Sequence, residues 1–343
     1  MRAVVAQSTT PAGETAGLMD VELPDLKPAG RDLRVRVEAV SVNPVDIKVR
    51  RGRPEGAPAQ VLGWDAAGVV VDTGTAATLF QAGDEVYFAG DVTRPGCNSE
   101  FCLVDERIVA GKPAGLDFAE AAALPLTSLT AYELLFQRMR IPLGQAGRGQ
   151  NLLIVGGGGG VGSMAIQLAK AMSRMTVIAT ASRPESRAWA QAMGADEVID
   201  HRGDMAGQLK AMGLVGPPAI HHAFCTADTD PYFPVLTELI APLGSLGFIV
   251  PPKAPLSMGA LHAKSITVAW ELMFTRSMYG TADMAEQGRI LTEVASLLKE
   301  GRIRSPLHQR WGPITAEVLQ RAHRQIESGA TLGKLVLEGW PAR

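Results

Sequence analysis

The sequence predicts an α/β protein in which a doubly wound parallel sheet is joined to a smaller, mostly β domain. Three observations support this fold class. From residue 151 onward, apolar strand-like runs alternate with helical stretches, which is typical of a parallel sheet. Before residue 118, short β-type runs alternate with glycine and proline turns. The stretch IVGGGGGVGS at 154–163 places a glycine turn between an apolar run and a helix.

The β-type runs of the first part follow one another at short intervals. The run LRVRVEAVSV at 33–42 alternates valines with charged residues, as a strand with one buried face does. Similar runs follow at 66–74, 84–90 and 100–106, separated by glycine and proline. This spacing favours a small, mostly β domain.

The middle of the chain predicts the parallel sheet. Helices are expected between strands, and 265–272 could add a sixth strand. After a helix at 284–301, the tail from residue 312 offers one helix and one last strand. The expected strands before the sixth lie at 151–155, 176–180, 197–200, 219–225 and 245–250.

The glycine turn carries the first functional signal. A flexible linker has polar, aperiodic flanks, whereas an apolar run precedes this turn and a helical pattern follows it. The spacing Gly157-x-Gly159-x-x-Gly162 fits the dinucleotide-binding fingerprint. Its glycines permit a tight turn, the approach of the pyrophosphate and close helix packing. With Gly160 and Val161 at the helix start, backbone N–H groups would face the phosphates.

The stretch VIATASRPESR at 177–187 distinguishes NADPH from NADH. An acidic residue about 20 positions after the fingerprint would bind the ribose 2′-hydroxyl of NADH, and basic residues would accept the 2′-phosphate of NADPH. The strand end has no acid but offers Ser182, Arg183 and Arg187. Because these groups can donate charge-assisted hydrogen bonds to a phosphate, NADPH is the predicted cofactor. In the alternative interpretation, Ser182 only caps a helix and Arg183 is solvated.

Composition argues against several other classes of function. The chain has 343 residues, 46% of them hydrophobic, which suits two globular domains. Its net charge is −2 and it has no long basic run, so nucleic acid is not an expected partner. It has no apolar run of about 18 residues and no signal-like start, so neither a membrane span nor export is expected. Three cysteines are too few for a disulfide framework, and we expect a cytoplasmic protein that acts on a small molecule.

Five motifs flank the glycine turn in a fixed order: SVNPVDIKVRRG, LGWDAAGVV, AGDEVY, AAALPLTSLTAYELL and, near the end, GKLVLEG. In this order they resemble the medium-chain dehydrogenase/reductase superfamily, and specifically its zinc-independent, quinone oxidoreductase-like branch. The stretches TASRPESRAWAQAMGADEVIDH and WELMFTRS resemble a bacterial subgroup labelled zinc-type alcohol dehydrogenase-like.

This resemblance implies a domain arrangement. A GroES-like substrate domain at 1–123 would be followed by a Rossmann NADP-binding domain at 124–300, and 301–343 would return to the GroES-like domain. The resemblance also implies NADPH in a cleft between the domains. A homodimer formed by joining the edges of two Rossmann sheets is the expected assembly.

The label of that subgroup suggests zinc, but the ligands differ. Zinc-dependent relatives have a cysteine where this chain has Asn43, and a Gly-His-Glu motif where it has Gly-Trp-Asp at 63–65. Their third ligand is a cysteine or an acid near Leu126. Asparagine is a poor zinc ligand, and tryptophan and leucine are not ligands. Cys97 and Cys102 are two of the four cysteines that a structural zinc needs, so metal-free chemistry is expected.

The expected reaction is hydride transfer from NADPH to a quinone or an α,β-unsaturated ketone, whose own carbonyl accepts the developing charge. By resemblance, Asn43 approaches the nicotinamide and Thr127 contacts its amide or ribose. Lys48 stands where some quinone reductases have a tyrosine; it could donate to the substrate carbonyl or supply a proton through water, and burial would favour this role. Asp46 would hold structure or orient Lys48. As alternatives, Asn43 belongs to a turn, Thr127 bonds within its helix, and Lys48 is solvated.

Other residues are weaker candidates. The backbone of Phe248 and Ile249 is expected to border the nicotinamide, because ligands bind at the carboxyl ends of such strands. Lys334 could approach the cofactor, and Cys225 is more often a buried small residue than a nucleophile. Two other functions stay open: a zinc-type alcohol dehydrogenase, and a non-enzymatic NADPH-binding or sensor protein. Three large aromatics could line a pocket or belong to the core: Trp64, Trp270 and Phe274.

Overall fold

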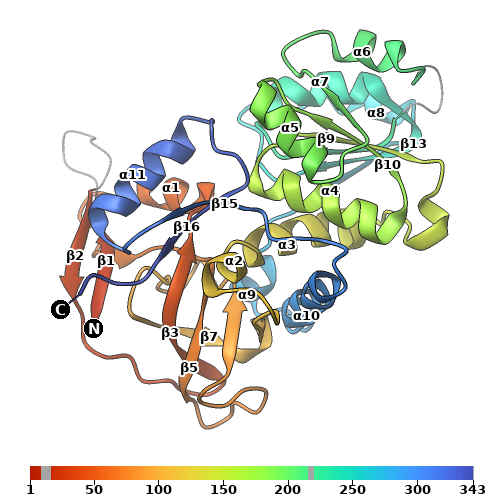
Figure 1. The fold of residues 1–343 in the computed structure, drawn as a ribbon. Helices are drawn as coiled ribbons and strands as arrows, with labels where there is room; N and C mark the ends of the chain where they lie inside the picture. Colours follow the sequence, from red (N-terminus) through yellow and green to blue (C-terminus); the bar gives the residue numbers. More distant parts are fainter. Residues whose placement is uncertain (9–16, 215–219, 343) are drawn as a thin grey trace. The chain divides into compact units, whose positions relative to one another are not determined.

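The computed structural model describes residues 1–8, 17–214 and 220–342, which form two compact units (Figure 1). The first unit comprises Met1–Leu126 and Phe274–Arg343, and the second comprises Thr127–Met273. The chain therefore returns to the first unit at Phe274, whereas the sequence placed this return at residue 301.

Helix α10 (Glu286–Lys299) accounts for the earlier return, because it packs against strand β8 (Val109–Gly111) of the first unit. A Cβ on Gly288 would lie 2.7 and 2.9 Å from two carbonyl oxygens of that neighbourhood, so the glycine permits this close approach. The hydroxyl of Tyr87 donates to the carbonyl oxygen of Leu291 in the same helix. The amphipathic pattern of a helix does not say which sheet it covers, and the sequence therefore assigned this helix to the other domain.

The main sheet of the first unit has seven strands. Six of them follow the order β15-β16-β3-β5-β6-β8, and the seventh, β7, pairs with β3. From Asp32 to Glu38, buried residues of β3 alternate with partly buried or exposed ones, as the sequence predicted, and the last three residues are all buried. The last strand pairs antiparallel with β3 and parallel with β15, so the C-terminal tail completes this sheet. The strands besides β8 are β3 (Asp32–Ser41), β5 (Ala66–Thr73), β6 (Glu85–Phe88), β7 (Phe101–Asp105), β15 (Leu307–Trp311) and β16 (Lys334–Glu338).

A smaller sheet of the first unit has the order β2-β1-β4. Its strands are β1 (Arg2–Ala6), β2 (Leu18–Glu22) and β4 (Gln60–Val61). Neither these strands nor β15 was predicted from the sequence. Strand β4 has only two residues, and β2 and β15 have no fully buried residue, so their sequences lack the apolar pattern on which strand prediction depends.

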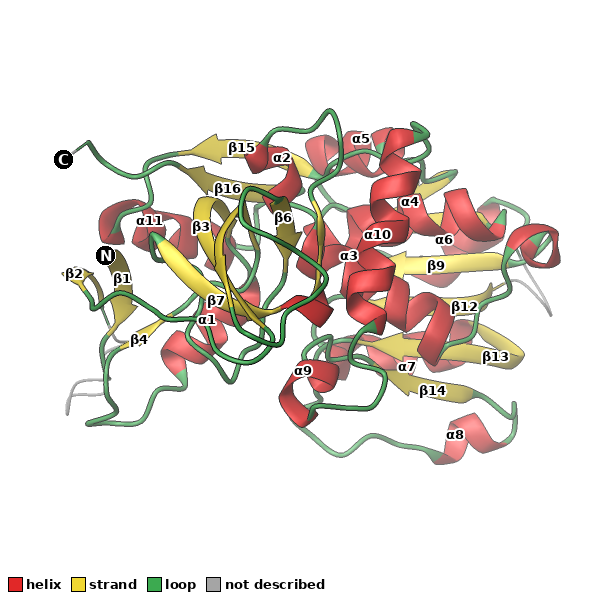
Figure 2. Cartoon of the chain, turned by 90° about the horizontal axis from the view of Figure 1, so that it is seen from below, coloured by secondary structure: helices red, strands yellow, loops and turns green. Residues whose placement is uncertain are grey.

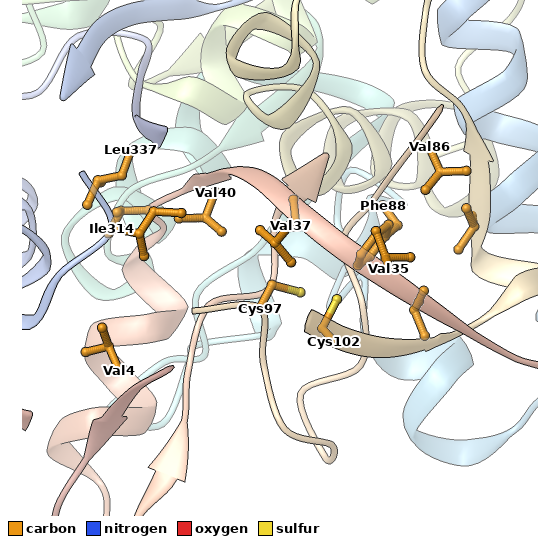
Figure 3. Packing of buried hydrophobic residues seen from close by; sticks show 14 of the residues in the cluster. Val4, Val35, Val37, Val40, Val86, Phe88, Cys97, Cys102, Ile314 and Leu337 are labelled. Atoms are coloured by element: carbon orange, nitrogen blue, oxygen red, sulfur yellow. The ribbon is translucent and has the colours of Figure 1, made fainter. Parts of the chain in front are cut away.

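Helices and a continuous apolar core complete the first unit. Figure 3 shows Phe88 beside Val35 at one end of this core and Leu337 beside Ile314 at the other. All four belong to one apolar cluster, which therefore joins β3, β6 and β16. Helix α3 (Pro125–Tyr132) begins in the first unit and continues in the second. The remaining helices of the first unit are α1 (Pro44–Arg51), α2 (Phe118–Ala122), α9 (Thr275–Tyr279) and α11 (Ala316–Glu327).

The second unit is built on a six-stranded sheet with the order β11-β10-β9-β12-β13-β14, and all neighbouring strands are parallel. Because the order reverses between β9 and β12, the sheet is doubly wound, which confirms the predicted fold class. The expected strand at 219–225 begins one residue outside the described part, at Ala219. The strands are β9 (Asn151–Val155), β10 (Thr176–Thr180), β11 (Glu197–Ile199), β12 (Ile220–Cys225), β13 (Ile240–Phe248) and β14 (Thr267–Trp270).

Helices connect the strands of this sheet (Figure 2). The strands β9 and β10 are buried beyond their first residue, as expected of strands that helices cover on both faces. Within the described ranges, no helix combines the length and the apolar character that crossing a membrane requires. The helices are α4 (Gly160–Ser173), α5 (Pro184–Ala192), α6 (Met205–Ala211), α7 (Thr229–Leu239) and α8 (Gly259–His262).

Candidate functional site

A glycine turn connects β9 to α4 in the second unit. Gly156 has a φ of 88°, and a Cβ there would lie 2.3 Å from the hydroxyl oxygen of Thr226. A Cβ on Gly157 would lie 2.7 Å from the Cβ of Ala179. A Cβ on Gly162 would lie 2.2 Å from the carbonyl oxygen of Gly156. The first and third glycines of the fingerprint therefore allow the turn, the helix and the strand to pack closely.

The turn leaves bare backbone at the start of α4. A Cβ on Gly159 would reach only the carbonyl oxygen of Gly156, at an ordinary 3.8 Å, so packing within the chain does not require this glycine. Gly159 caps the helix without a side chain, and Gly160 and Val161 form its first turn. N–H groups at such a helix start attract phosphate. Sequence reasoning missed Gly156, although the run of five glycines begins there.

The predicted phosphate-binding residues follow β10. Ser182 is half-buried, and Arg183 is the N-cap residue of α5 with a side chain that is 37% exposed. Arg187 has a different position. Its guanidinium donates to the carbonyl oxygens of Ala181, at 3.3 Å, and Val198, at 2.7 Å. These bonds tie the end of β10 to β11, so the structure favours a structural role for Arg187 over contact with a phosphate.

A basic residue outside the predicted set lies beside Ser182. Arg202 donates from Nη2 to the carbonyl oxygen of Ser182 at 2.7 Å and pairs with Asp200 at 2.9 Å. Its side chain is 64% exposed and can turn toward a ligand. Sequence reasoning missed Arg202 because it follows the next strand, 20 positions after Ser182. The sequence signal that could have found Arg202 is a basic residue just after the strand that became β11.

A buried polar cluster lies at the start of α1 in the first unit. Asn43, the N-cap residue, is 1% exposed. Its amide donates to the carbonyl oxygen of Ser41 at 3.2 Å and to Oδ2 of Asp65 at 3.1 Å. Its Oδ1 accepts from Nζ of Lys334. The same Nζ donates to the carbonyl oxygen of Val42 at 3.1 Å and lies 3.2 Å from Oδ2 of Asp65.

The charges of this cluster follow from its geometry. Three acceptors surround Nζ of Lys334, one for each hydrogen of an ammonium group, which favours the charged amine. Burial lowers the pKa of Lys334 and raises the pKa of Asp65, while their mutual attraction opposes both shifts. Asp46 adds a second carboxyl group, whose Oδ2 accepts from the N–H of Asn43 at 2.8 Å. Burial raises the pKa of Asp46 to about 7.

Lys48 lies on α1 but outside this cluster. Its side chain is exposed, so the burial that would have favoured its expected role as a proton donor is absent. Asp46 was expected either to hold structure or to orient Lys48. Its carboxylate accepts from the N–H of Asn43, which is a structural contact.

The other predicted residues of the second unit are mostly buried. Thr127 is its first residue and is 2% exposed. The ring of Phe248 is fully buried, so only its backbone remains for the expected contact, and Ile249 after it is half-buried. Cys225 ends β12, and burial raises the pKa of its thiol to about 12. Such a thiol is a poor nucleophile at neutral pH.

The three aromatic candidates differ in their surroundings. Trp64 and Phe274 are buried in the first unit, with ring centroids 6.4 Å apart in an edge-to-face arrangement. Trp270 is 42% exposed in the second unit, with its ring 5.3 Å from that of Phe248. Trp64 and Phe274 are therefore core residues, although Trp64 also borders a cavity of about 200 Å³.

The donor set of the polar cluster does not fit a catalytic zinc. Such an ion takes three ligands from cysteine, histidine and carboxylate. The expected ligand positions hold Asn43 and Trp64, whose indole N–H donates to the carbonyl oxygen of Arg94 at 3.3 Å. The ammonium of Lys334 would repel a divalent ion beside Asp65. Among the described residues, no three or more histidines, cysteines and acids are grouped so as to hold a metal ion.

Sequence profiles of two domain families match this chain. The alcohol dehydrogenase GroES-like domain matches residues 29–130, and the zinc-binding dehydrogenase domain matches residues 160–291. These ranges fall mainly on the first and the second unit, respectively. The chain belongs to the medium-chain dehydrogenase/reductase superfamily, the class of proteins that this pair of domains defines.

Individual relatives narrow this assignment. A zinc-type alcohol dehydrogenase-like protein of Staphylococcus aureus strain COL is 40% identical over 311 residues, which cover 90% of this chain and 91% of that protein. The chain therefore belongs to the zinc-type alcohol dehydrogenase-like family. A crystal structure from Rhizobium etli CFN 42, of a candidate zinc-dependent alcohol dehydrogenase protein, is 48% identical with a TM-score of 0.92 and covers 100% of this chain and 99% of its own.

Two other solved structures share the fold at lower identity. A mycobacterial protein complexed with NADPH is 26% identical with a TM-score of 0.83, covering 99% of this chain and 100% of its own. The quinone oxidoreductase of Pseudomonas syringae pv. tomato DC3000 is 25% identical with a TM-score of 0.82, covering 98% of this chain and 99% of its own. The chain is thus an oxidoreductase of this superfamily with quinone oxidoreductases among its structural neighbours.

Proposed function

We propose that the protein transfers hydride from NADPH to an α,β-unsaturated ketone or a quinone, without a metal ion. The observation that carries this proposal is the cluster of Lys334, Asp65 and Asn43. Oxidation of an alcohol by a zinc-type mechanism needs a Lewis acid on the alcohol oxygen. In this cluster, the cation beside Asp65 is the ammonium of Lys334, which three acceptors hold in place. The side chains present are unsuited to zinc.

The second unit supports the choice of cofactor. When bound, NADPH supplies the hydride. The bare backbone from Gly156 to Gly160 suits a pyrophosphate, and Ser182, Arg183 and Arg202 offer donors for a 2′-phosphate. The mycobacterial relative that is complexed with NADPH agrees with this choice.

A conjugated acceptor suits a site without a metal. Its own carbonyl stabilises the negative charge that forms when hydride adds, so the protein has to position the acceptor and donate a hydrogen bond. Both amide hydrogens of Asn43 are engaged by Ser41 and Asp65, so we assign Asn43 to shaping the site. The exposed Lys48 stays our candidate for donating to the carbonyl, and Thr127 stays our candidate contact of the nicotinamide.

We also propose that the second unit forms a cytoplasmic homodimer. Strand β14 is an edge strand of the described sheet, and such a strand presents N–H and C=O groups with which a second copy can pair. Trp270 and Leu272, in and just after this strand, are 42% and 51% exposed. Light scattering on the purified protein should give the mass of two chains, and the mass of one chain would contradict this part of the proposal.

The proposed reaction is tested with protein from which a chelator has removed metal ions. NADPH oxidation is followed with quinones, cyclic and linear enones, and simple aldehydes as acceptors. We expect turnover with enones or quinones, at a rate that added zinc does not increase. Oxidation of an alcohol by NADP⁺ that appears only with zinc would replace our proposal by a zinc-type alcohol dehydrogenase. Tight NADPH binding without turnover of any acceptor would favour a binding or sensor protein.

A further inference from the structure

Cys97 and Cys102 lie against each other in the core of the first unit. Cys97 precedes β7, Cys102 is its second residue, and the two are 3% and 2% exposed. Their side chains point toward one another (Figure 3), and both belong to the same cluster of buried residues. The third cysteine, Cys225, lies in the second unit, where its thiol donates to the carbonyl oxygen of Ala227.

The cavity of about 200 Å³ that borders Trp64 also borders Cys97. Its walls include apolar residues and four charged ones, namely Asp91, Arg94, Asp105 and Arg107. Cys102 does not line this cavity, so a molecule that enters it meets Cys97 first. Since a water molecule takes about 30 Å³ in the liquid, the cavity is large enough for a small hydroperoxide.

The segment around Cys97 is tied to the residues just before Asp65. The N–H groups of Gly96, Cys97 and Asn98 donate to carbonyl oxygens of residues 61–63 at 2.6–2.9 Å. Asp65 belongs to the polar cluster with Lys334, so a covalent change at Cys97 acts on the backbone that positions this cluster.

We propose that Cys97 and Cys102 are a redox-sensitive pair that closes to a disulfide when a hydroperoxide enters the cavity, and that closure alters the activity of the protein. The sulfur of Cys97 attacks one peroxide oxygen, the O–O bond breaks, and the other oxygen leaves with a proton as an alcohol or water. The sulfur of Cys102 then attacks the resulting sulfenic acid, the S–S bond forms, and water leaves. The two thiols lose two electrons, and the hydroperoxide gains them.

The surroundings of Cys97 make this reaction slow at neutral pH. The interaction of the Cys97 S–H with Cys102 and burial raise the pKa of Cys97 well above its ordinary value, and the charges of Asp65 and Asp46 add to this. Because the thiolate is the nucleophile, disulfide formation should become faster as the pH rises.

The test uses the full chain, reduced and then treated with hydrogen peroxide. The protein is denatured, alkylated and analysed by mass spectrometry. We expect a mass lower by about 2 Da before alkylation, a peptide pair linked through Cys97 and Cys102, and an alkylated Cys225 as the internal reference. A dithiol reductant should reverse the change. Alkylation of both Cys97 and Cys102 after treatment, or random pairing that includes Cys225, would overturn the proposed pair.

Two further measurements separate the order of events from the effect on activity. In Cys102→Ser, Cys97 should stop at the sulfenic acid, which a dimedone probe labels, and labelling at Cys225 instead would contradict the role of Cys97. The rate of NADPH oxidation should differ between the disulfide form and the reduced form and should return on reduction. An unchanged rate in the fully linked protein would overturn the regulatory effect. The mass measurement does not depend on whether the proposed hydride transfer is correct.

Discussion

Replacing Lys334 by methionine removes the ammonium group of the polar cluster and keeps a side chain of similar length. Asp65, which is fully buried, then loses an ion partner 3.2 Å away. The carbonyl oxygen of Val42 and Oδ1 of Asn43 each lose a hydrogen-bond donor. Removing one partner of a buried ion pair destabilises a protein by about 3–5 kcal/mol, so we expect Lys334→Met to lower the free energy of unfolding by about 3 kcal/mol or more.

Unfolding in urea at neutral pH measures this loss. Lys253→Met is the matched control, because Lys253 lies at the same 3.2 Å from Asp228, but both side chains are more than half exposed. There we expect a loss below about 1 kcal/mol. Asp65→Asn, added to Lys334→Met, removes the stranded carboxylate and should recover part of the stability. The reasoning is refuted if Lys334→Met loses no more than the control, or if the second substitution adds its own loss in full.

Gly156→Ala should weaken NADPH binding and cost at least about 1 kcal/mol of stability, because a φ of 88° and the hydroxyl of Thr226 leave no room for a methyl group. Calorimetric titration measures the binding, and a melting curve measures the stability. A variant with wild-type binding would contradict the role of this turn. Arg183→Ala should raise the KM for NADPH by about tenfold and leave the KM for NADH unchanged, whereas Arg187→Ala should lower the melting temperature and keep the ratio of the two KM values. The pKa of Asp46 is about 7 in the folded protein and near its ordinary 3.8 when the chain unfolds, so the folded state holds an extra proton between these values. The free energy of unfolding should therefore fall by about 1.4 kcal/mol per pH unit as the pH rises through this window, and Asp46→Asn should remove this slope in urea titrations.

The second unit could be predicted closely because its signals are local. The expected strands at 151–155 and 176–180 match β9 and β10 residue for residue. Strand, glycine turn and helix follow one another within about 20 residues, and neighbouring residues alone determine each of these elements. The bonds of Arg187 to Ala181 and Val198 could not be predicted, because the carbonyl groups that a guanidinium reaches depend on how a helix lies on its sheet.

The polar cluster of the first unit could not be predicted, because it joins segments that are far apart in the chain. Lys334 lies 291 residues after Asn43, and Asp65 lies 22 residues after it. Asn43 and Lys334 were separate candidates in the sequence, without any pattern that links them. The different surroundings of Lys48 and Lys334 could not be predicted either. Both are lysines in the sequence, and only the fold exposes Lys48 and buries Lys334.

The pairing of β16 with β3 has a consequence for the order in which the protein forms during synthesis. Ribosomes release the strands of the first sheet early, but its last strand and Lys334 emerge only after the whole second unit. Until then, the nascent chain has an open sheet edge, and the carboxyl groups of Asp65 and Asp46 lack the charge of Lys334. The first unit begins to emerge before the second, yet we expect it to reach its native state later. Shortened chains that lack residue 334 should be recognised by proteases through that incomplete sheet.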